Sequence, residues 1–434
     1  MRNEGLICDN TESDSIIKLI SVKGMRRMQY KSSVVPMNDK NNFRSQYSQS
    51  IEISMLARAI TQKIMTNEYF DKKTDSEKSS LCDMITCAGI IRGIGQPPFG
   101  YIGDAAIREW FSENINNMFL TPETGESILD KKMIDDLKTF CGAKRAVRQF
   151  CRYTEEIRLP EGILHILINS KCHNSEKCMM LSEEEFINNT EYPGTKSYLS
   201  YILEASAYIV SVTSAIEEAV ENRYIICRQL LYYLRNQEDF DDDISAEEYQ
   251  SFCEIVKYLS DCYIGSRLDP GKNEDIDAVH KWIVYLRGRM TDFAVSSFCD
   301  NYRDISNGKF DGDLINNSWS RTIKKVFSRS QRNLFASSEE FLLAVNSASK
   351  IVYYLTDIFI KAVETENEIS SLFFTDTRIK MLIPEIFRNK YRECSSGKSE
   401  SYKAYLRIIM VLDYICSLTD AEALNLYRKL RFDM

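Results

Sequence analysis

Residues 197–234 constrain the fold most, because this apolar stretch contains neither proline nor glycine. Its apolar side chains recur at helical spacing, so it predicts a long, largely buried helix followed by a second helix. Residues 50–65 and 403–430 have the same apolar period, and Thr419 is placed to cap the last predicted helix. No segment shows sustained alternation of apolar and polar residues. We therefore expect an all-α protein.

The composition agrees with a large helical protein. The 434 residues include only 17 Gly and 8 Pro, which favours long uninterrupted elements. The 13 Cys form no C-x-x-C pair, and we find neither a signal-peptide core nor an apolar run long enough to cross a bilayer. We expect a cytoplasmic protein with reduced thiols and no membrane segment. The net charge of −8 makes nucleic acid an improbable main partner.

Two stretches contain residue types that bind metals. The acidic residues 236–249 are interpreted as a solvated connection before a capped helix. Cys172, His173 and Cys178 lack two further zinc ligands at a matched spacing. The other two histidines, His165 and His280, are far from His173 in sequence. We expect all three to be satisfied or exposed side chains, and we expect no cofactor.

The segment AGIIRGIGQPPFGYIGDAAIREWF, residues 88–111, carries a recognisable turn. It is similar to the HD-domain deoxynucleoside triphosphate triphosphohydrolases, the bacterial dGTPase family, in which a His-Asp pair precedes Ile-Gly-x-Pro-Pro-Phe-Gly-His-x-Gly-Glu. The matching residues are Ile94, Gly95, Pro97, Pro98, Phe99, Gly100 and Gly103. This resemblance implies a dGTPase-like multi-helix fold.

Other segments extend the resemblance, in order, over nearly the whole chain. Residues 24–53 resemble the family segment that ends in R-T-R-x-T-H-S-x-E-V. Residues 201–223 resemble the helix E-A-A-D-D-I-x-Y-x-x-x-D-x-E-D, and residues 412–430 resemble D-Y-x-x-G-M-T-D. A helix-rich stretch of the family falls at 334–355. The order of these motifs makes the resemblance specific.

The residues that the resemblance would place on the metal ion have all changed. The first metal-binding His falls on Gln49, the His-Asp pair on Arg92 and Gly93, and the last Asp on Ala207. An HD site needs imidazole and carboxylate donors to hold the cation that activates water. Gly and Ala offer no side-chain donor, and Arg carries a permanent positive charge. We therefore expect no metal at this position.

Further active-site positions have changed too. The catalytic His that follows the turn corresponds to Tyr101, and the Glu after it to Asp104. The segment F-E-G-N-A-Q reads FCGAKR here. The replacements at the remaining positions are Cys141, Ala143 and Arg145 in that segment, Gln46 for a phosphate-binding Arg, Ser211 and Ala215 for a sugar-binding Tyr and Asp, and Ser33 for a sugar-facing Gln. No catalytic residue is assigned.

Arg92 admits two interpretations. Its guanidinium either pairs with a local carboxylate, Asp104 or Glu204, or replaces the lost cation and binds a phosphate; the first is favoured. Tyr101 is expected to fill the former pocket rather than to stack on a base. Six cations are candidates for an anion-binding surface: Arg26, Arg27, Arg44, Arg92, Lys144 and Arg145.

These observations predict one large helical domain, 1–434, with a degenerate HD core at 15–235 and a C-terminal helical part at 236–434. The expected function is that of a catalytically inactive subunit, regulatory or structural, in a dNTP-hydrolysing or nucleotide-responsive complex. Homo-oligomers and hetero-oligomers are both candidates, the latter with an active paralogue. Two alternatives are an enzyme with relocated chemistry and a nucleotide sensor that does not hydrolyse its ligand.

Overall fold

The protein is described from a computed structural model. The described residues are 16, 19, 21–34, 36, 44–121, 125–153, 159–170, 178–184, 187, 196–236, 246–268, 273–315, 338–364 and 375–432. Over these ranges the chain is helical and forms no strand, with two isolated β-bridges, Ser32 to Ser45 and Leu120 to Ser127. The all-α prediction is confirmed.

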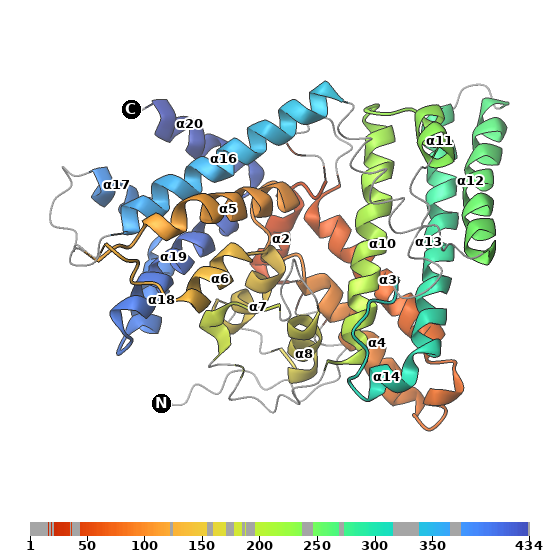
Figure 1. Ribbon diagram of the computed structural model, residues 1–434, viewed down its shortest axis with the longest axis horizontal. Coiled ribbons are helices and arrows are strands. Elements are labelled where there is room, and N and C mark those ends of the chain that lie inside the picture. Colours follow the sequence, from red (N-terminus) through yellow and green to blue (C-terminus); the bar gives the residue numbers. More distant parts are fainter. Residues whose placement is uncertain are drawn as a thin grey trace.

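One set of helices shares a large apolar core on the side of the molecule where α10 to α13 stand nearly upright (Figure 1). Its elements are α2 (Lys23–Arg27), α3 (Gln46–Ile64), α4 (Asp75–Ile91), α7 (Gly142–Arg152), α8 (Glu161–Asn169), α10 (Tyr198–Glu221), α11 (Cys227–Arg235), α12 (Ala246–Arg267), α13 (Glu274–Asp300) and α14 (Tyr302–Ser306). Short 3₁₀ helices lie at Met28–Tyr30 and Glu68–Phe70.

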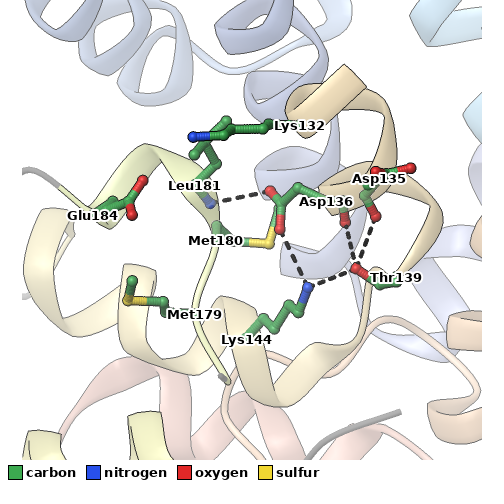
Figure 2. A pocket seen from close by; sticks show the side chains of 9 residues that line it. All are labelled: Lys132, Asp135, Asp136, Thr139, Lys144, Met179, Met180, Leu181 and Glu184. Carbon is green, nitrogen blue, oxygen red and sulfur yellow. Dashed lines mark hydrogen bonds and ion pairs between the residues drawn. The ribbon is translucent and has the colours of Figure 1, made fainter. Parts of the chain in front are cut away.

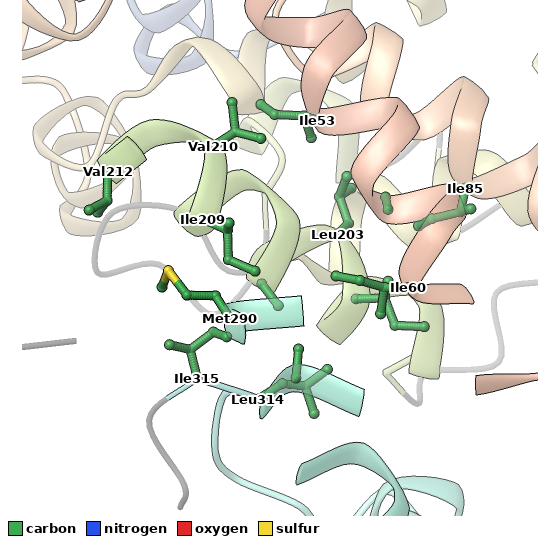
Figure 3. Close-up of a cluster of buried hydrophobic side chains, with 14 of the residues drawn as sticks. Ile53, Ile60, Ile85, Leu203, Ile209, Val210, Val212, Met290, Leu314 and Ile315 are labelled. Atoms are coloured by element: carbon green, nitrogen blue, oxygen red, sulfur yellow. The ribbon is translucent and has the colours of Figure 1, made fainter. Parts of the chain in front are cut away.

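The helix α10 is the centre of this core. It packs against α3, α4, α8 and α13, which agrees with the long, largely buried helix predicted within residues 197–234. Figure 3 shows side chains of α3, α4, α10 and α13 meeting, among them Ile60, Ile85, Leu203 and Met290. Gly89 allows the close approach of α4 to α3, because a Cβ there would lie 2.6 Å from Ser54 Cα.

The same helix corrects one expectation about membranes. We expected no apolar run long enough to span a bilayer, yet α10 (Tyr198–Glu221) has the required length and hydropathy. In this structure, however, 78% of its most apolar window is buried inside the protein. Its apolarity is therefore explained by its place at the centre of the core.

A second apolar core brings N-terminal and C-terminal helices together at the other side of the molecule (Figure 1). Its elements are α5 (Gly100–Asn114), α6 (Lys131–Lys138), α16 (Glu339–Val363), α17 (Thr375–Leu382), α18 (Glu385–Ser395), α19 (Glu400–Ser417) and α20 (Asp420–Phe432), with 3₁₀ turns at Ile115–Asn117 and Leu181–Glu183. The helix α5 packs along α16, and α16 contacts α19 and α20.

These two cores do not follow the predicted division of the chain at residues 235 and 236. The helices α5 and α6, from the expected HD core, belong to the second core with the C-terminal helices. The helices α12 and α13, from the expected C-terminal part, belong to the first core, where α13 packs on α3 and α10. The chain therefore crosses between the cores more than once.

Candidate functional site

The retained turn joins α4 to α5 and is anchored by its backbone. Phe99 and Gly100 both have left-handed backbone angles, with φ of 60° and 55°. Gly95 permits close contact with α7, since a Cβ there would lie 2.1 Å from the Gly142 carbonyl oxygen. Asp420, at the start of α20, accepts a hydrogen bond of 2.8 Å from the Phe99 amide. The turn residues thus serve backbone geometry.

The four positions that correspond to the family's metal ligands lie on helices that pack together. Gln49 is on α3, Arg92 and Gly93 follow the end of α4, and Ala207 is on α10. The space at Gly93 is occupied. A Cβ there would lie 2.3 Å from Ser50 Oγ and 2.6 Å from Met28 Cε. A carboxylate at this position has no room unless both neighbours move.

The expected partners of Arg92 are wrong. Its guanidinium donates to the Ser170 hydroxyl at 3.1 Å, at the end of α8. Asp104 instead accepts from the Gly142 amide at 3.0 Å, and Glu204 pairs with Lys196 at 2.6 Å. Burial raises the pKa of Asp104 well above its usual value, and the neighbouring Cys141 raises it further. Among the described residues, neither carboxylate forms an ion pair with Arg92.

Tyr101 was expected to fill the former pocket, and this expectation is also wrong. The residue lies in the first turn of α5 and is 68% exposed. It is the second residue of α5, directly after Gly100, which has a positive φ. The side chain of Tyr101 is directed to solvent. The position that corresponds to the catalytic His is therefore on the surface.

The other positions taken from the resemblance are dispersed between core and surface. Gln46 is buried and its side-chain nitrogen lies 3.3 Å from the carbonyl oxygens of Ser32 and Pro97. Ser33 Oγ donates to the Arg44 carbonyl at 2.8 Å. Ala215, Cys141 and Ala143 are buried, whereas Ser211 is exposed. Cys172, His173 and the acidic residues 237–245 lie outside the described residues; His165 is half-buried.

A buried lysine that sequence reasoning did not single out connects three distant segments. Lys31 Nζ donates to the carbonyl oxygens of Gln96 and Cys416, both at 2.6 Å. Burial lowers the pKa of Lys31 to about 7, against the opposing effects of neighbouring Cys416 and Asp420. Ser32, the next residue, donates to Asp420 from its amide and its hydroxyl. The N-terminal segment, the turn and the C-terminal helices therefore meet here.

Carboxylates of the protein already engage four of the six cations proposed for an anion surface. Arg27 pairs with Glu422, Lys144 with Asp136, and Arg145 with Asp413. Arg44 lies 2.7 Å from Glu52 and 2.6 Å from Glu217. Burial lowers the pKa of Arg44, but the two carboxylates outweigh it and raise the pKa overall. Arg26 is exposed. Anion binding by these residues stays a prediction.

Asp413 of α19 is the centre of a second buried charge network. Its carboxylate accepts from Arg145 at 3.2 Å, from Arg148 at 2.8 Å and from the Tyr153 hydroxyl at 2.7 Å. Arg148 also pairs with Glu183 at 2.6 Å. Burial and the Asp413 charge both raise the pKa of Tyr153. The charged groups of this network are almost wholly buried and join α7 to α19. Removing one of them would leave its partner as a buried, uncompensated charge, so we assign the network a role in stability.

A pocket of about 250 Å³ lies beside this network, between α6, α7 and residues 179–184. Figure 2 shows Lys144 directed toward Asp136 and Thr139 at its wall. Asp136 also accepts from the Leu181 amide and the Tyr405 hydroxyl. None of the four positions matched to metal ligands lines this pocket. It is therefore separate from those four positions.

Comparison with known proteins gives a consistent set of relatives. No protein-family model matches the chain. A deoxyguanosinetriphosphate triphosphohydrolase-like protein of Listeria innocua is 24% identical over 95% of this chain and 92% of its own. A probable deoxyguanosinetriphosphate triphosphohydrolase of Pseudomonas aeruginosa is 23% identical over 95% and 91%. The deoxyguanosinetriphosphate triphosphohydrolase of Salmonella typhimurium is 22% identical over 95% and 92%.

These matches run through both cores, because they cover almost the whole chain and almost the whole of each relative. They agree with the order of the motifs and with the all-helical fold. Over almost its whole length the chain is therefore similar to proteins named as deoxyguanosinetriphosphate triphosphohydrolases or as like them.

Proposed function

We propose that this protein is a dGTPase-family member that does not hydrolyse nucleotides and that serves as a structural or regulatory subunit. One observation carries the proposal. The position of the family's metal-binding Asp is Gly93, and the space for a longer side chain is taken by Ser50 and Met28. The loss of the ligand is therefore accompanied by two side chains, Ser50 and Met28, at the place where its Cβ would lie.

The charge at this position supports the same proposal. Arg92 stands where the family has a His, and its guanidinium is oriented by Ser170. A permanent cation at this place opposes a divalent metal ion, which would have to activate water and neutralise phosphate charge. Gln49 offers only a neutral amide, and Ala207 offers no donor. Triphosphate hydrolysis in the manner of the family has no support from these residues.

A hydrolysis assay tests the proposal. The purified chain is incubated with dATP, dCTP, dGTP and dTTP in turn, with Mg²⁺, Mn²⁺ or Co²⁺, and triphosphate release is followed. The Salmonella typhimurium relative serves as the positive control. We expect no release above a protein-free blank. Release that scales with protein concentration and co-purifies with the chain would refute the proposal and favour relocated chemistry.

Exposed apolar side chains support the role as a subunit. Tyr232 of α11, Leu268 after α12 and Val284 of α13 are 66%, 80% and 74% exposed. We infer that they contribute to a contact with another protein, because aromatic residues are enriched at the centres of protein interfaces. Equilibrium dialysis with labelled dGTP separates this role from that of a nucleotide sensor: a structural subunit retains no nucleotide, whereas a sensor retains about one per chain.

A further inference from the structure

Glu217, Glu221 and His280 bring three metal-binding side chains together away from the positions discussed above. The two glutamates lie one turn apart on α10, and His280 lies on α13, which packs against α10. His280 Nδ1 is 2.8 Å from a Glu217 oxygen, and Nε2 is 3.0 Å from a Glu221 oxygen. The three ligand atoms lie within 4.8 Å of one another.

This cluster is distinct from the former HD position. Ala207, which corresponds to the last HD ligand, precedes Glu217 on the same helix by three turns, or about 15 Å along the axis. None of Gln49, Arg92 and Gly93 belongs to the cluster. Loss of the family's ligands therefore says nothing about metal binding here.

The ligand types match a transition-metal ion. Two carboxylates and one imidazole form a three-ligand set of the kind that Zn²⁺ takes in open sites, with water at the fourth position. His280 can donate to both glutamates at once only when both of its ring nitrogens carry a proton. A metal ion bound by one ring nitrogen and two carboxylates replaces that arrangement without the second proton.

The surrounding charges favour a divalent cation. Glu217 belongs to an ion-pair cluster with Glu52 and Glu218 through Arg44, and Arg287 pairs with Glu52 at 2.7 Å. With Glu221, four carboxylates of the described residues lie around Arg44, Arg287 and His280, so the cluster is rich in negative charge.

The geometry also includes the support and the access that a metal site needs. Arg44 holds one oxygen of Glu217 at 2.6 Å, which fixes the carboxylate and leaves its other oxygen facing His280. Glu217 is 8% exposed, while the His280 side chain is 49% exposed, so an ion can enter from solvent. We propose that Glu217, Glu221 and His280 bind one divalent transition-metal ion of the Zn²⁺ class, which joins α10 to α13.

Calorimetric titration of the full-length, chelator-treated protein with Zn²⁺ tests this proposal. We expect one strongly bound ion per chain. His280→Ala should weaken binding by more than about tenfold, because it removes one of three protein ligands. Glu221→Gln keeps the shape of a glutamate and provides a second variant in case His280→Ala does not fold. Glu274→Gln is the matched control, since Glu274 is an exposed carboxylate on α13 outside the cluster, and it should bind like wild type.

The bound ion must also be assigned to these residues rather than to cysteine. X-ray absorption at the zinc edge distinguishes nitrogen and oxygen ligands at about 2.0–2.2 Å from thiolates at about 2.3 Å. We expect a nitrogen and oxygen shell that disappears in the folded variant. No strong binding, a sulfur shell, or full affinity in a folded His280→Ala or Glu221→Gln variant would overturn the proposal.

Discussion

At the scale of single residues, the polar side chains that match the family's motifs can be separated by the contacts they make. In the stretches that resemble the family, the polar residues that remain are those that hold backbone and helices in place. Glu52 and Glu217 bind Arg44, Asp413 binds two arginines, and Asp420 binds the Phe99 amide. At the positions that the resemblance would place on metal or nucleotide, other residue types stand. A residue whose ion pair holds two helices together contributes to folding whether or not the protein hydrolyses a nucleotide.

The first prediction concerns the closed space at Gly93. Gly93→Ala should lower the free energy of unfolding by about 1–3 kcal/mol, because its Cβ overlaps Ser50 Oγ and Met28 Cε. Gly288→Ala, in the interior of α13, should raise it by about 1 kcal/mol, because a Cβ there meets nothing within 4 Å and Ala favours the helix. Urea denaturation measures both. Equal effects of the two substitutions would mean that the space at Gly93 is open.

The second prediction concerns Lys31 and pH. Its pKa of about 7 in the folded protein lies below its unfolded value of 10.5, so the unfolded chain binds more protons between these values. The free energy of unfolding should therefore rise with pH from about 7 to about 10, by roughly 1 kcal/mol per pH unit. The free energy of unfolding of wild type is compared with that of Lys31→Met, which lacks the titrating amine. Cysteines also titrate in this pH range, but they are present in both proteins.

Chemical denaturation at several pH values gives the difference between wild type and Lys31→Met. We expect this difference to shift in favour of wild type as the pH rises through that window. A difference that does not vary with pH would show that Lys31 has the same pKa in the folded and unfolded chains.

At the scale of elements, the helices were predictable because their apolar period and their caps are local properties. Residues 197–220 form the central α10, and Thr419 accepts from the Glu422 amide at 3.3 Å in the cap of α20, as predicted. The partner of Arg92 and the exposure of Tyr101 were not predictable. The partner of Arg92 is Ser170, a residue remote in sequence, and the exposure of Tyr101 depends on the left-handed backbone of the preceding residues Phe99 and Gly100.

The way in which the chain alternates between the two cores could not be predicted either, because it depends on contacts between helices that are distant in sequence. Apolar stripes on α5 and α16 show that both helices bury a face, but not that they bury these faces against each other. The buried network at Asp413 was signalled only by the D-Y-x-x-G-M-T-D match, which gave no partners. Lys31 had no signal, because a single lysine in a polar segment gives no indication of burial.

The third prediction tests the contact between α7 and α19. Asp413→Ala should lower the free energy of unfolding by about 3–5 kcal/mol, because it leaves Arg145 and Arg148 buried beside an unfilled acceptor site. Glu400→Gln on the same helix removes the negative charge of the ion pair with Lys403 at the protein surface. It should change the free energy of unfolding by less than about 1 kcal/mol. Thermal and urea unfolding report both values. A small effect at Asp413 would contradict the structural role of the network.

At the scale of the whole molecule, the chain forms two apolar cores, and its match covers 92% of the Listeria innocua relative. The fourth prediction is that this architecture serves assembly. Light scattering at micromolar concentration should give a mass above the 50.3 kDa of one chain, or a partner should co-purify from the native host. Tyr232→Ser together with Val284→Ser should reduce that mass if α11 to α13 form the contact. A monomer without a partner would contradict the prediction.

We propose that this fold lacks the hydrolytic chemistry of its dGTPase relatives, and a single-turnover experiment decides the question. The chain is mixed in excess over labelled dGTP with Mn²⁺, so that even one slow catalytic cycle per molecule is visible. We predict that dGTP remains intact for as long as the protein stays folded. Conversion of the bound dGTP to deoxyguanosine and triphosphate at a rate that saturates with protein concentration would contradict it.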